Sequence, residues 1–405
     1  MLNIALTIPI VLLLIISPLL SPLRIIQLLI LFVATAAPYT AAAVMIAVTP
    51  IIYFKILTNN GLKLTGLTRK IIYLSIVWLG YAAFTLLWLN DLPRFMTEYI
   101  QLILLLLLTL ALVNSINTLD DVKSTNFFLI FSGCLVSLKS FYESLSTDYI
   151  EINYYAFISL VTCIAIPISY LNFRNTKSVL LTILFVSIGF LGIVANDSRA
   201  STLLGVLLLV VRFFYLLDIR KLIKWINVFM VLLIAPIAIF WYYNMNDDNI
   251  LKSVIDFERN YSNLERLALI NQSIDTYKSN LLGVGYGSTN AVFMSAASYT
   301  ELNYPHPHNS LAHIAVEIGT VGILIFVYLF YLCIKVILSL NKIKDNLTEL
   351  NSLYKVSICI VIVLFLFSFL DDMFFNGMFN FYCMMFFAYI YSLSKINQKS
   401  TQHVA

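Results

Sequence analysis

The sequence predicts an all-α membrane protein with 12 or 13 transmembrane helices and one large outer loop that contains short helices. Of the 405 residues, 60% are apolar and only 11% are charged, and the mean hydropathy is +0.90. This composition leaves too little polar surface to coat a water-soluble globule. Apolar stretches of the roughly 17 to 25 residues that a spanning helix needs recur along nearly the whole chain.

The first 36 residues are open to two interpretations. Pro18, Pro22 and Arg24 divide one apolar run into two short pieces, which form either two spans or one span and a re-entrant segment. The opening MLNIALTIPIVLLL has no basic region and no small-residue cleavage site, so no cleavable signal is expected. The remaining spans are expected at 40–57, 71–89, 98–114, 127–142, 154–172, 178–195, 201–217, 224–243, 312–338, 355–370 and 376–394.

These spans divide the chain into N-terminal transmembrane helices (1–243), a large loop (244–311), and C-terminal transmembrane helices with a short tail (312–405). Because Lys and Arg are retained in cytoplasmic loops, the side that holds most basic residues is predicted to be cytoplasmic. That side includes 58–70 and the C-terminus, and the large loop faces outward. The net charge of +4 thus reflects topology, and no nucleic-acid partner is expected.

Cysteine and nucleotide chemistry are not predicted. The five cysteines lie in or beside apolar spans without CxxC spacing, and we interpret them as packing residues. No nucleotide-binding loop of the Walker type is present. The functional residues are therefore expected in the loops.

The large loop is unusual because every other connection is short. Its middle, SNLERLALINQSIDTY, predicts an amphipathic helix that lies on the membrane or across the mouth of the bundle, with Arg266 projecting from it. The apolar positions of this helix are Leu264, Leu267, Ile270 and Ile274. The following LLGVGYG lacks the spacing of a dinucleotide fingerprint, and predicts a tight turn that approaches the bundle or a ligand.

Three of the four histidines fall within YPHPHNSLAH at 304–313. The two prolines favour an extended backbone up to a helix that Asn309 or Ser310 can N-cap. An imidazole at the top of that helix titrates near neutral pH and can accept a proton from a hydroxyl, which is the role expected for His308. His313 is expected to be a bundle residue hydrogen-bonded to Glu317. A metal site built from His306, His308 and His313 is the alternative.

Two arginines on the outer side are also unusual, since cations are disfavoured there. Together, Arg199 and Arg266 would form a guanidinium pair suited to phosphate oxygens. The alternatives are snorkelling of Arg199 with Asp197 as its partner, and pairing of Arg266 with Glu265.

Three segments resemble the O-antigen ligase family and the wider superfamily that includes O-antigen polymerases. HNSLAHIAVEIGTVG holds His308 and Asn309, nine further residues, and then Gly319-x-x-Gly322. RLALINQSIDTYKSNLLGVGYG resembles the segment that precedes this signature in the large periplasmic loop, and SRAS at 198–201 resembles the outer arginine before a span. The likeness in architecture runs from about residue 70 onward.

This resemblance implies a membrane-embedded inverting glycosyltransferase in the bacterial inner membrane, with its active site facing the periplasm. The donor would be a glycan on undecaprenyl pyrophosphate, whose pyrophosphate meets Arg199 and Arg266. His308 would be the catalytic base, with Asn309, Gly319, Gly322 and His306 in supporting roles. Neither a metal nor another cofactor is expected, because two arginines can neutralise the leaving group.

The resemblance leaves the acceptor open. A ligase transfers finished glycan to the lipid A core, whereas a polymerase transfers growing glycan to the next lipid-linked repeat unit. We favour the ligase because the match to the signature is complete. A polyprenyl-linked oligosaccharide flippase is a third possibility, but such transporters tend to carry charges inside their spans. Here the spans are nearly free of charge, which favours a one-sided enzyme.

Overall fold

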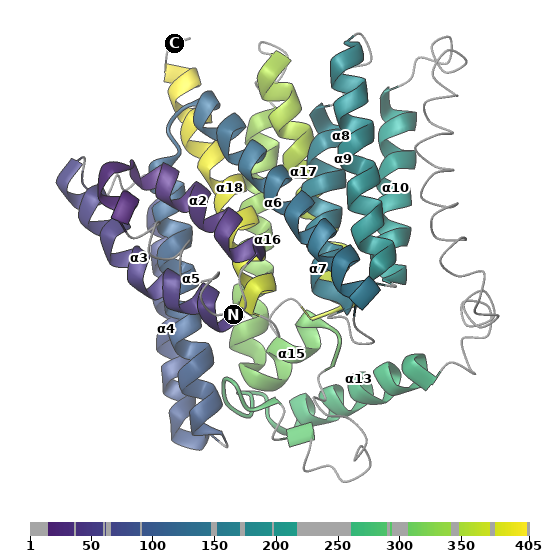
Figure 1. Cartoon of the computed structure of the whole chain (residues 1–405). Coiled ribbons are helices and arrows are strands. Elements are labelled where there is room, and N and C mark those ends of the chain that lie inside the picture. Colours follow the sequence, from purple (N-terminus) through teal and green to yellow (C-terminus); the bar gives the residue numbers. More distant parts are fainter. Residues whose placement is uncertain are drawn as a thin grey trace.

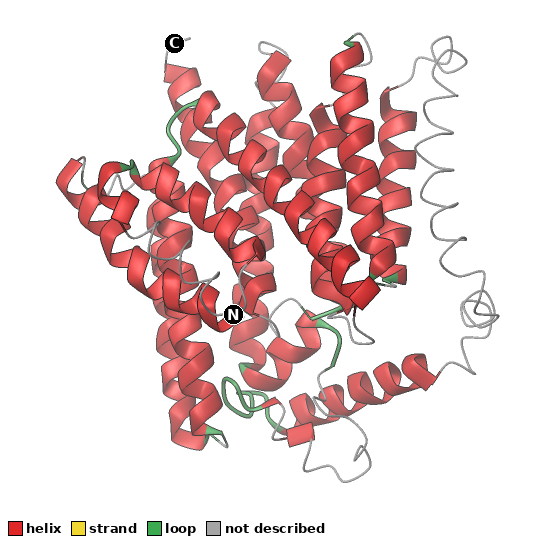
Figure 2. Ribbon diagram, viewed as in Figure 1, coloured by secondary structure: helices red, strands yellow, loops and turns green. Residues whose placement is uncertain are grey.

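The described part of the computed structural model is mostly helical, with short loops (Figure 2), and it contains no strand. The all-α prediction is therefore confirmed. The structure describes residues 15–35, 38–59, 61, 66–89, 91–146, 152–170, 175–196, 198–216, 261–289, 292–293, 307–341, 348–372 and 377–402.

The helices follow the predicted apolar runs closely, because a spanning helix satisfies its own backbone hydrogen bonds. In the first half these are η1 (Ser17–Leu19), α2 (Pro22–Thr35), α3 (Pro38–Asn59), α4 (Gly66–Phe84), η2 (Thr85–Trp88), α5 (Leu92–Ser115), α6 (Leu119–Ser146) and α7 (Ile152–Ser159). Then come η3 (Leu160–Ala165), α8 (Ile166–Tyr170), α9 (Thr176–Ala195), α10 (Arg199–Leu216), α13 (Tyr261–Ser279), α15 (Ser310–Glu317), α16 (Gly319–Asn341), α17 (Thr348–Leu370) and α18 (Gly377–Gln402).

Seven helices in the described part of the chain are long and apolar enough to cross a membrane: α3, α4, α5, α6, α9, α16 and α17. The count of 12 or 13 spans stays a prediction, since the expected span at 224–243 lies outside the described residues. So do residues 1–14, and α2 alone has 14 residues. The question of one or two spans before residue 36 therefore stays open.

The spanning helices pack side by side, and α13 lies across one end of the bundle (Figure 1). The end of α18 lies at the opposite end of the bundle, as the predicted topology requires for the large loop and the C-terminus. At that opposite end, the buried Lys395 side chain donates to the carbonyls of Val113 and Asn114 (2.9 Å each) and of Ile116 (3.2 Å). An ammonium group there stabilises the carbonyl end of α5.

The predicted span 154–172 is one apolar segment whose middle is a π-helix, Leu160–Ala165. The amide of Ile166 donates to Val161, five residues back. Pro167 follows directly, and its ring has no N–H and crowds the carbonyl four residues earlier. The wider turn accommodates this proline inside a continuous apolar segment.

The prediction of one continuous span at 312–338 is wrong. The structure breaks it into α15 and α16 at Gly319, which has φ +65°. The amide of Thr320, which follows, donates to the carbonyl of Leu281 in the large loop (2.9 Å). The first part of the expected span is therefore a short separate helix, and the apolar segment long enough to cross the membrane begins at Gly319.

The helix predicted in the large loop exists as α13, and the residues that it buries against the rest of the protein lie beside the predicted apolar stripe. Leu269 and Ser273 are buried, and Leu269 clusters with Val284, Phe293 and Val316. Two residues of the predicted apolar stripe, Leu267 and Ile274, are instead 50% and 44% exposed. The contacts made by the loop, and not the helical spacing alone, determine which face is covered.

Candidate active site at the α13 end of the bundle

The start of α15 is tied to the end of α17 through side chains. Asn309 is the N-cap of α15, as predicted: its Oδ1 accepts from the Ala312 amide (2.9 Å). Its Nδ2 donates to the carbonyl of Phe369 (3.1 Å), and the Ser310 hydroxyl donates to that of Asp371 (3.0 Å). These bonds satisfy carbonyls that the end of α17 leaves without helical partners.

His308 sits immediately before this cap in an unusual backbone conformation. Its φ is +45°, in the left-handed region, so the predicted extended backbone does not include His308. Its Nδ1 lies 3.3 Å from Oδ1 of Asp371, and its side chain is 29% exposed. The left-handed residue reverses the chain and aims the ring at this carboxylate, a constraint typical of functional positions.

The contact with Asp371 determines what the His308 ring can do. A carboxylate beside Nδ1 favours the neutral tautomer that carries its proton there, which puts the lone pair on Nε2. Asp371 is itself held, since its Oδ1 accepts from the Asp372 amide (2.8 Å). The ring is thus oriented on one nitrogen and basic on the other, and part of it reaches solvent.

His313 lies one turn into α15 and is buried between two carboxylates. Its Nε2 is 3.1 Å from Oε1 of Glu317, which confirms the predicted partner. Its Nδ1 makes a short contact with Oδ2 of Asp372, a partner that the sequence did not predict. Glu317 Oε1 also accepts from the Thr289 hydroxyl (2.6 Å), which ties α15 to the large loop.

The charges around His313 favour an imidazolium. Burial lowers the pKa of the imidazole, but the carboxylates of Asp372 and Glu317 raise it by more than burial lowers it. The pKa of His313 therefore lies well above its ordinary value. Burial raises the pKa of Glu317, but the neighbouring imidazolium outweighs this and holds that pKa below its ordinary value. A ring that keeps its proton is a poor base, so His313 acts as a structural ion pair.

The glycine-rich segment packs against the break between α15 and α16. Val284 and Gly285 donate backbone hydrogen bonds to the carbonyls of Val316 (2.8 Å) and Glu317 (3.1 Å). A Cβ on Gly283, whose φ is +83°, would lie 2.3 Å from the Glu317 carbonyl oxygen, and one on Gly319 would lie 2.3 Å from that of Leu281. Of the two predicted roles for this turn, close approach to the bundle is the one observed.

The same segment is fastened to the end of α4. Trp88 Nε1 donates to the carbonyl of Gly283 (3.0 Å), and the Tyr81 hydroxyl donates to that of Leu282 (2.9 Å). Gly322, the last glycine of the signature, has a packing role: a Cβ there would lie 2.6 Å from side-chain atoms of Ile314 and Ile318.

The other predicted site residues are less completely placed. Arg199 is the first residue of α10, which begins at the end of the bundle where α13 lies (Figure 1). The contacts of its side chain and all of His306 lie outside the described residues. Arg266 is half-buried on α13, and no hydrogen bond or ion pair joins it to another described side chain. The pairing of the two arginines therefore remains a proposal.

Sequence reasoning missed Asp371 and Asp372, which hold the two histidines. The available signal was a pair of adjacent acids directly after an apolar span, on the same predicted side as the histidines. It also missed Arg94, whose Nε lies 2.6 Å from Oε1 of Glu98 on α5 and whose charge acts on Glu317.

A family model matches part of the chain. Residues 183–327 match the family model described as O-antigen ligase, which covers the chain from α9 into α16. The match contains Arg199, Arg266 and His308. Comparison with curated proteins gives no match. Residues 183–327 are therefore similar to the O-antigen ligase family, within a helical chain whose described part holds seven helices able to cross a membrane.

Proposed function

We propose that the chain is an O-antigen ligase that transfers a glycan from undecaprenyl pyrophosphate to a sugar hydroxyl of the lipid A core. The transfer would invert the anomeric centre, require no metal, and take place on the periplasmic side of the inner membrane. The observation that carries the proposal is the His308–Asp371 pair, which orients a partly exposed imidazole at the end of the bundle. The family match supports the class of reaction.

The chemistry assigns one step to each group. The acceptor oxygen attacks the anomeric carbon, its proton passes to Nε2 of His308, and the bond from that carbon to the pyrophosphate oxygen breaks. The leaving pyrophosphate takes the bonding electron pair. A single displacement of this kind inverts the configuration at the anomeric carbon.

Arg199 and Arg266 would bind the pyrophosphate and stabilise the charge that develops as it leaves. Guanidinium groups suit this task because they present paired N–H donors and keep their charge. Asp371 would act as a positioning residue through His308. His313 would hold α15 against Asp372, with Glu317 of the same helix as its second partner, without entering the reaction.

The test is transfer by the purified full-length chain in lipid vesicles, with an undecaprenyl-pyrophosphate-linked glycan and lipid A core as the two substrates. The expected product is glycan attached to lipid A core, with undecaprenyl pyrophosphate released. Longer lipid-linked glycan formed without lipid A core would instead identify a repeat-unit polymerase. Movement of the donor across the bilayer with no new glycosidic bond would identify a transporter and overturn the proposal.

A further inference from the structure

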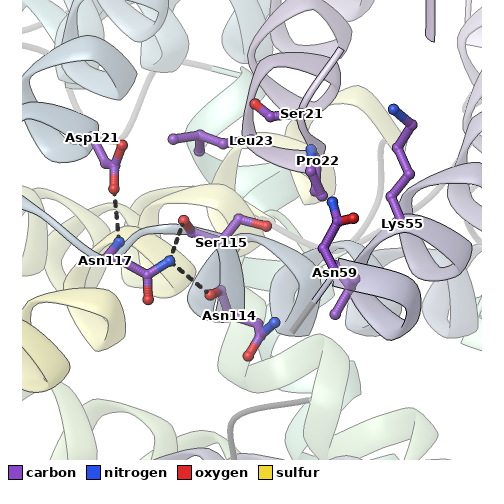
Figure 3. Close-up of a pocket in the computed structure, with 10 residues that line it drawn as sticks. Ser21, Pro22, Leu23, Lys55, Asn59, Asn114, Ser115, Asn117 and Asp121 are labelled. Carbon is purple, nitrogen blue, oxygen red and sulfur yellow. Dashed lines mark hydrogen bonds between the residues drawn. The ribbon is translucent and has the colours of Figure 1, made fainter. Parts of the chain in front are cut away.

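A polar pocket of about 300 Å³ lies at the end of the bundle opposite α13. It forms where α2 and α6 begin and where α3 and α5 end, far from His308 (Figure 3). Its volume is at the lower end of the range for ligand sites. The residues that matter for its chemistry are Lys55, Asn59, Ser115, Asn117 and Asp121.

One side of the pocket is rich in donors. Lys55 and Asn59 are four residues apart on α3 and so share a face of that helix. The Lys55 ammonium donates to the carbonyls of Pro18 (2.6 Å) and Leu20 (2.5 Å). These two carbonyls use two of the three N–H groups of the ammonium. Because they are neutral, they do not cancel its positive charge.

The other side is rich in acceptors. Asp121 Oδ2 accepts from the backbone amides of Asn117 and Thr118 (2.9 Å each). The Asn117 amide group donates to the Ser115 carbonyl (2.9 Å), so its oxygen is the atom left for a donor. That oxygen is buried and has no hydrogen-bond partner among the described residues. Figure 3 shows Asp121 and Lys55 on opposite sides of the pocket.

This arrangement of charge selects a zwitterion. A cationic ligand would be repelled by Lys55, and an anionic ligand would be repelled by Asp121. A molecule with both a phosphate and an ammonium group can pair with both residues. None of the described residues that line the pocket is aromatic. Since quaternary ammonium groups are typically recognised by aromatic cages, a primary ammonium that donates N–H bonds fits this pocket better.

The surroundings of the pocket indicate that such a ligand comes from the membrane. Leu19, just before the pocket-lining Ser21, is 85% exposed. Phe54 and Leu57, next to Lys55 and Ile56 on α3, are 68% and 59% exposed. Large apolar side chains exposed on a spanning helix face the acyl chains of lipids.

We propose that this pocket binds the phosphoethanolamine headgroup of a phospholipid. The phosphate lies at Lys55 and Asn59, and the primary ammonium lies at Asp121. The site is separate from the transfer reaction and does not depend on it.

Binding is measured on the delipidated full-length protein in detergent, by native mass spectrometry and by the shift in Tm with added lipid. The probes are phosphatidylethanolamine, phosphatidylcholine and phosphatidylglycerol with the same acyl chains, and free phosphoethanolamine. Phosphatidylethanolamine should bind about tenfold or more tightly than either other lipid, because each of those loses charge-assisted hydrogen bonds at one wall. Equal binding of the three lipids would overturn the proposal, and free phosphoethanolamine that binds as tightly as the lipid would overturn the membrane source.

Variants locate the headgroup. Asp121→Asn keeps an oxygen for the Asn117 and Thr118 amides but removes the charge, and it should abolish the preference for phosphatidylethanolamine over phosphatidylglycerol. Asn59→Ala should weaken phosphatidylethanolamine binding. The matched control is Asp120→Asn: this neighbouring carboxylate is 92% exposed beside Lys123, outside the pocket, and its loss should change neither value. A preference retained in Asp121→Asn would overturn the placement of the ammonium.

Discussion

The buried and half-buried basic side chains at the two ends of the bundle have different partners. At the α13 end, His308, His313 and Arg94 each face a carboxylate. At the other end, the ammonium groups of Lys55 and Lys395 face backbone carbonyls. A cation on a carbonyl only stabilises a chain end, whereas an imidazole on a carboxylate is oriented and can exchange a proton. Proton transfer is therefore expected at the α13 end alone.

The largest effect expected from a single change is that of His308→Ala. Removal of a general base typically lowers the rate by about 10²- to 10⁴-fold, so glycan transfer should nearly disappear while the protein still inserts and binds the lipid-linked donor. His306→Ala should be milder, and a chelator should leave wild-type activity unchanged. An assay with purified protein measures all three. An active His308→Ala, an inactive His306→Ala and inhibition by chelator would together replace the base with a metal site.

Replacement of Arg199 or Arg266 by Ala should lower transfer by about 10²- to 10³-fold, the usual cost of losing one group that stabilises developing negative charge. Lysine should restore only part of the activity, because an ammonium cannot make the bidentate contact. Arg69→Ala, at the exposed start of α4, is the control and should be active. Wild-type activity of Arg199→Ala at normal protein level would show that Arg199 does not bind the pyrophosphate.

Asp371→Asn tests whether the carboxylate orients His308. The expected loss is roughly 10- to 100-fold, by analogy with partners that orient metal-binding histidines. Because the carboxylate orients the ring and does not touch the donor, kcat should fall while KM for the lipid-linked donor stays unchanged. An unchanged kcat together with reduced Tm would assign Asp371 a purely structural role.

Gly319→Ala and Gly283→Ala should destabilise the α13 end by about 1–3 kcal/mol or more, since both positions have positive φ and no room for a Cβ. Thermal unfolding in detergent measures the effect. Gly80→Ala on α4 is the matched control: nothing lies within 4 Å of its Cβ position, so alanine should be neutral or stabilising. Equal Tm values for all three variants would contradict the close backbone contact.

The smallest effect concerns pH. The folded-state pKa of His313 is raised, so the stability it contributes is fully present below its unfolded pKa and is lost as pH rises through the folded value. The pKa of Glu317 is lowered, so its contribution is lost as pH falls through its folded value. Tm should therefore decline at both extremes, and His313→Gln should remove the alkaline decline. Identical alkaline profiles would exclude a charged His313.

Local patterns predicted much of the molecule. Apolar runs predicted the helices because hydrophobicity and helix length are properties of short segments. The N-cap of Asn309 and the His313–Glu317 contact span at most one helical turn, so they too were predictable. The break at Gly319 was not, because it depends on a contact with Leu281, which lies far away in the sequence.

The partners of the histidines were beyond local reasoning for the same reason. Asp371 lies 63 residues beyond His308, and only the packing of α15 on α17 shows that their loops meet. The buried face of α13 likewise depends on Val316, which belongs to a later helix. The arginine pair combines residues from α10 and α13 and stays a prediction.

The contact between the glycine-rich segment and the break at Gly319 also sets an order of assembly. Val284 and Gly285 donate to carbonyls at 316 and 317, so these amides have no native acceptor until the end of α15 has been synthesised, and the Leu281 carbonyl has no native donor until Thr320 at the start of α16 follows. The large loop must then wait on its side of the membrane while the chain turns back into the bilayer. Its last step of folding is therefore coupled to insertion of α16, and the amides of Val284, Gly285 and Thr320 should gain protection from hydrogen exchange together, at that moment.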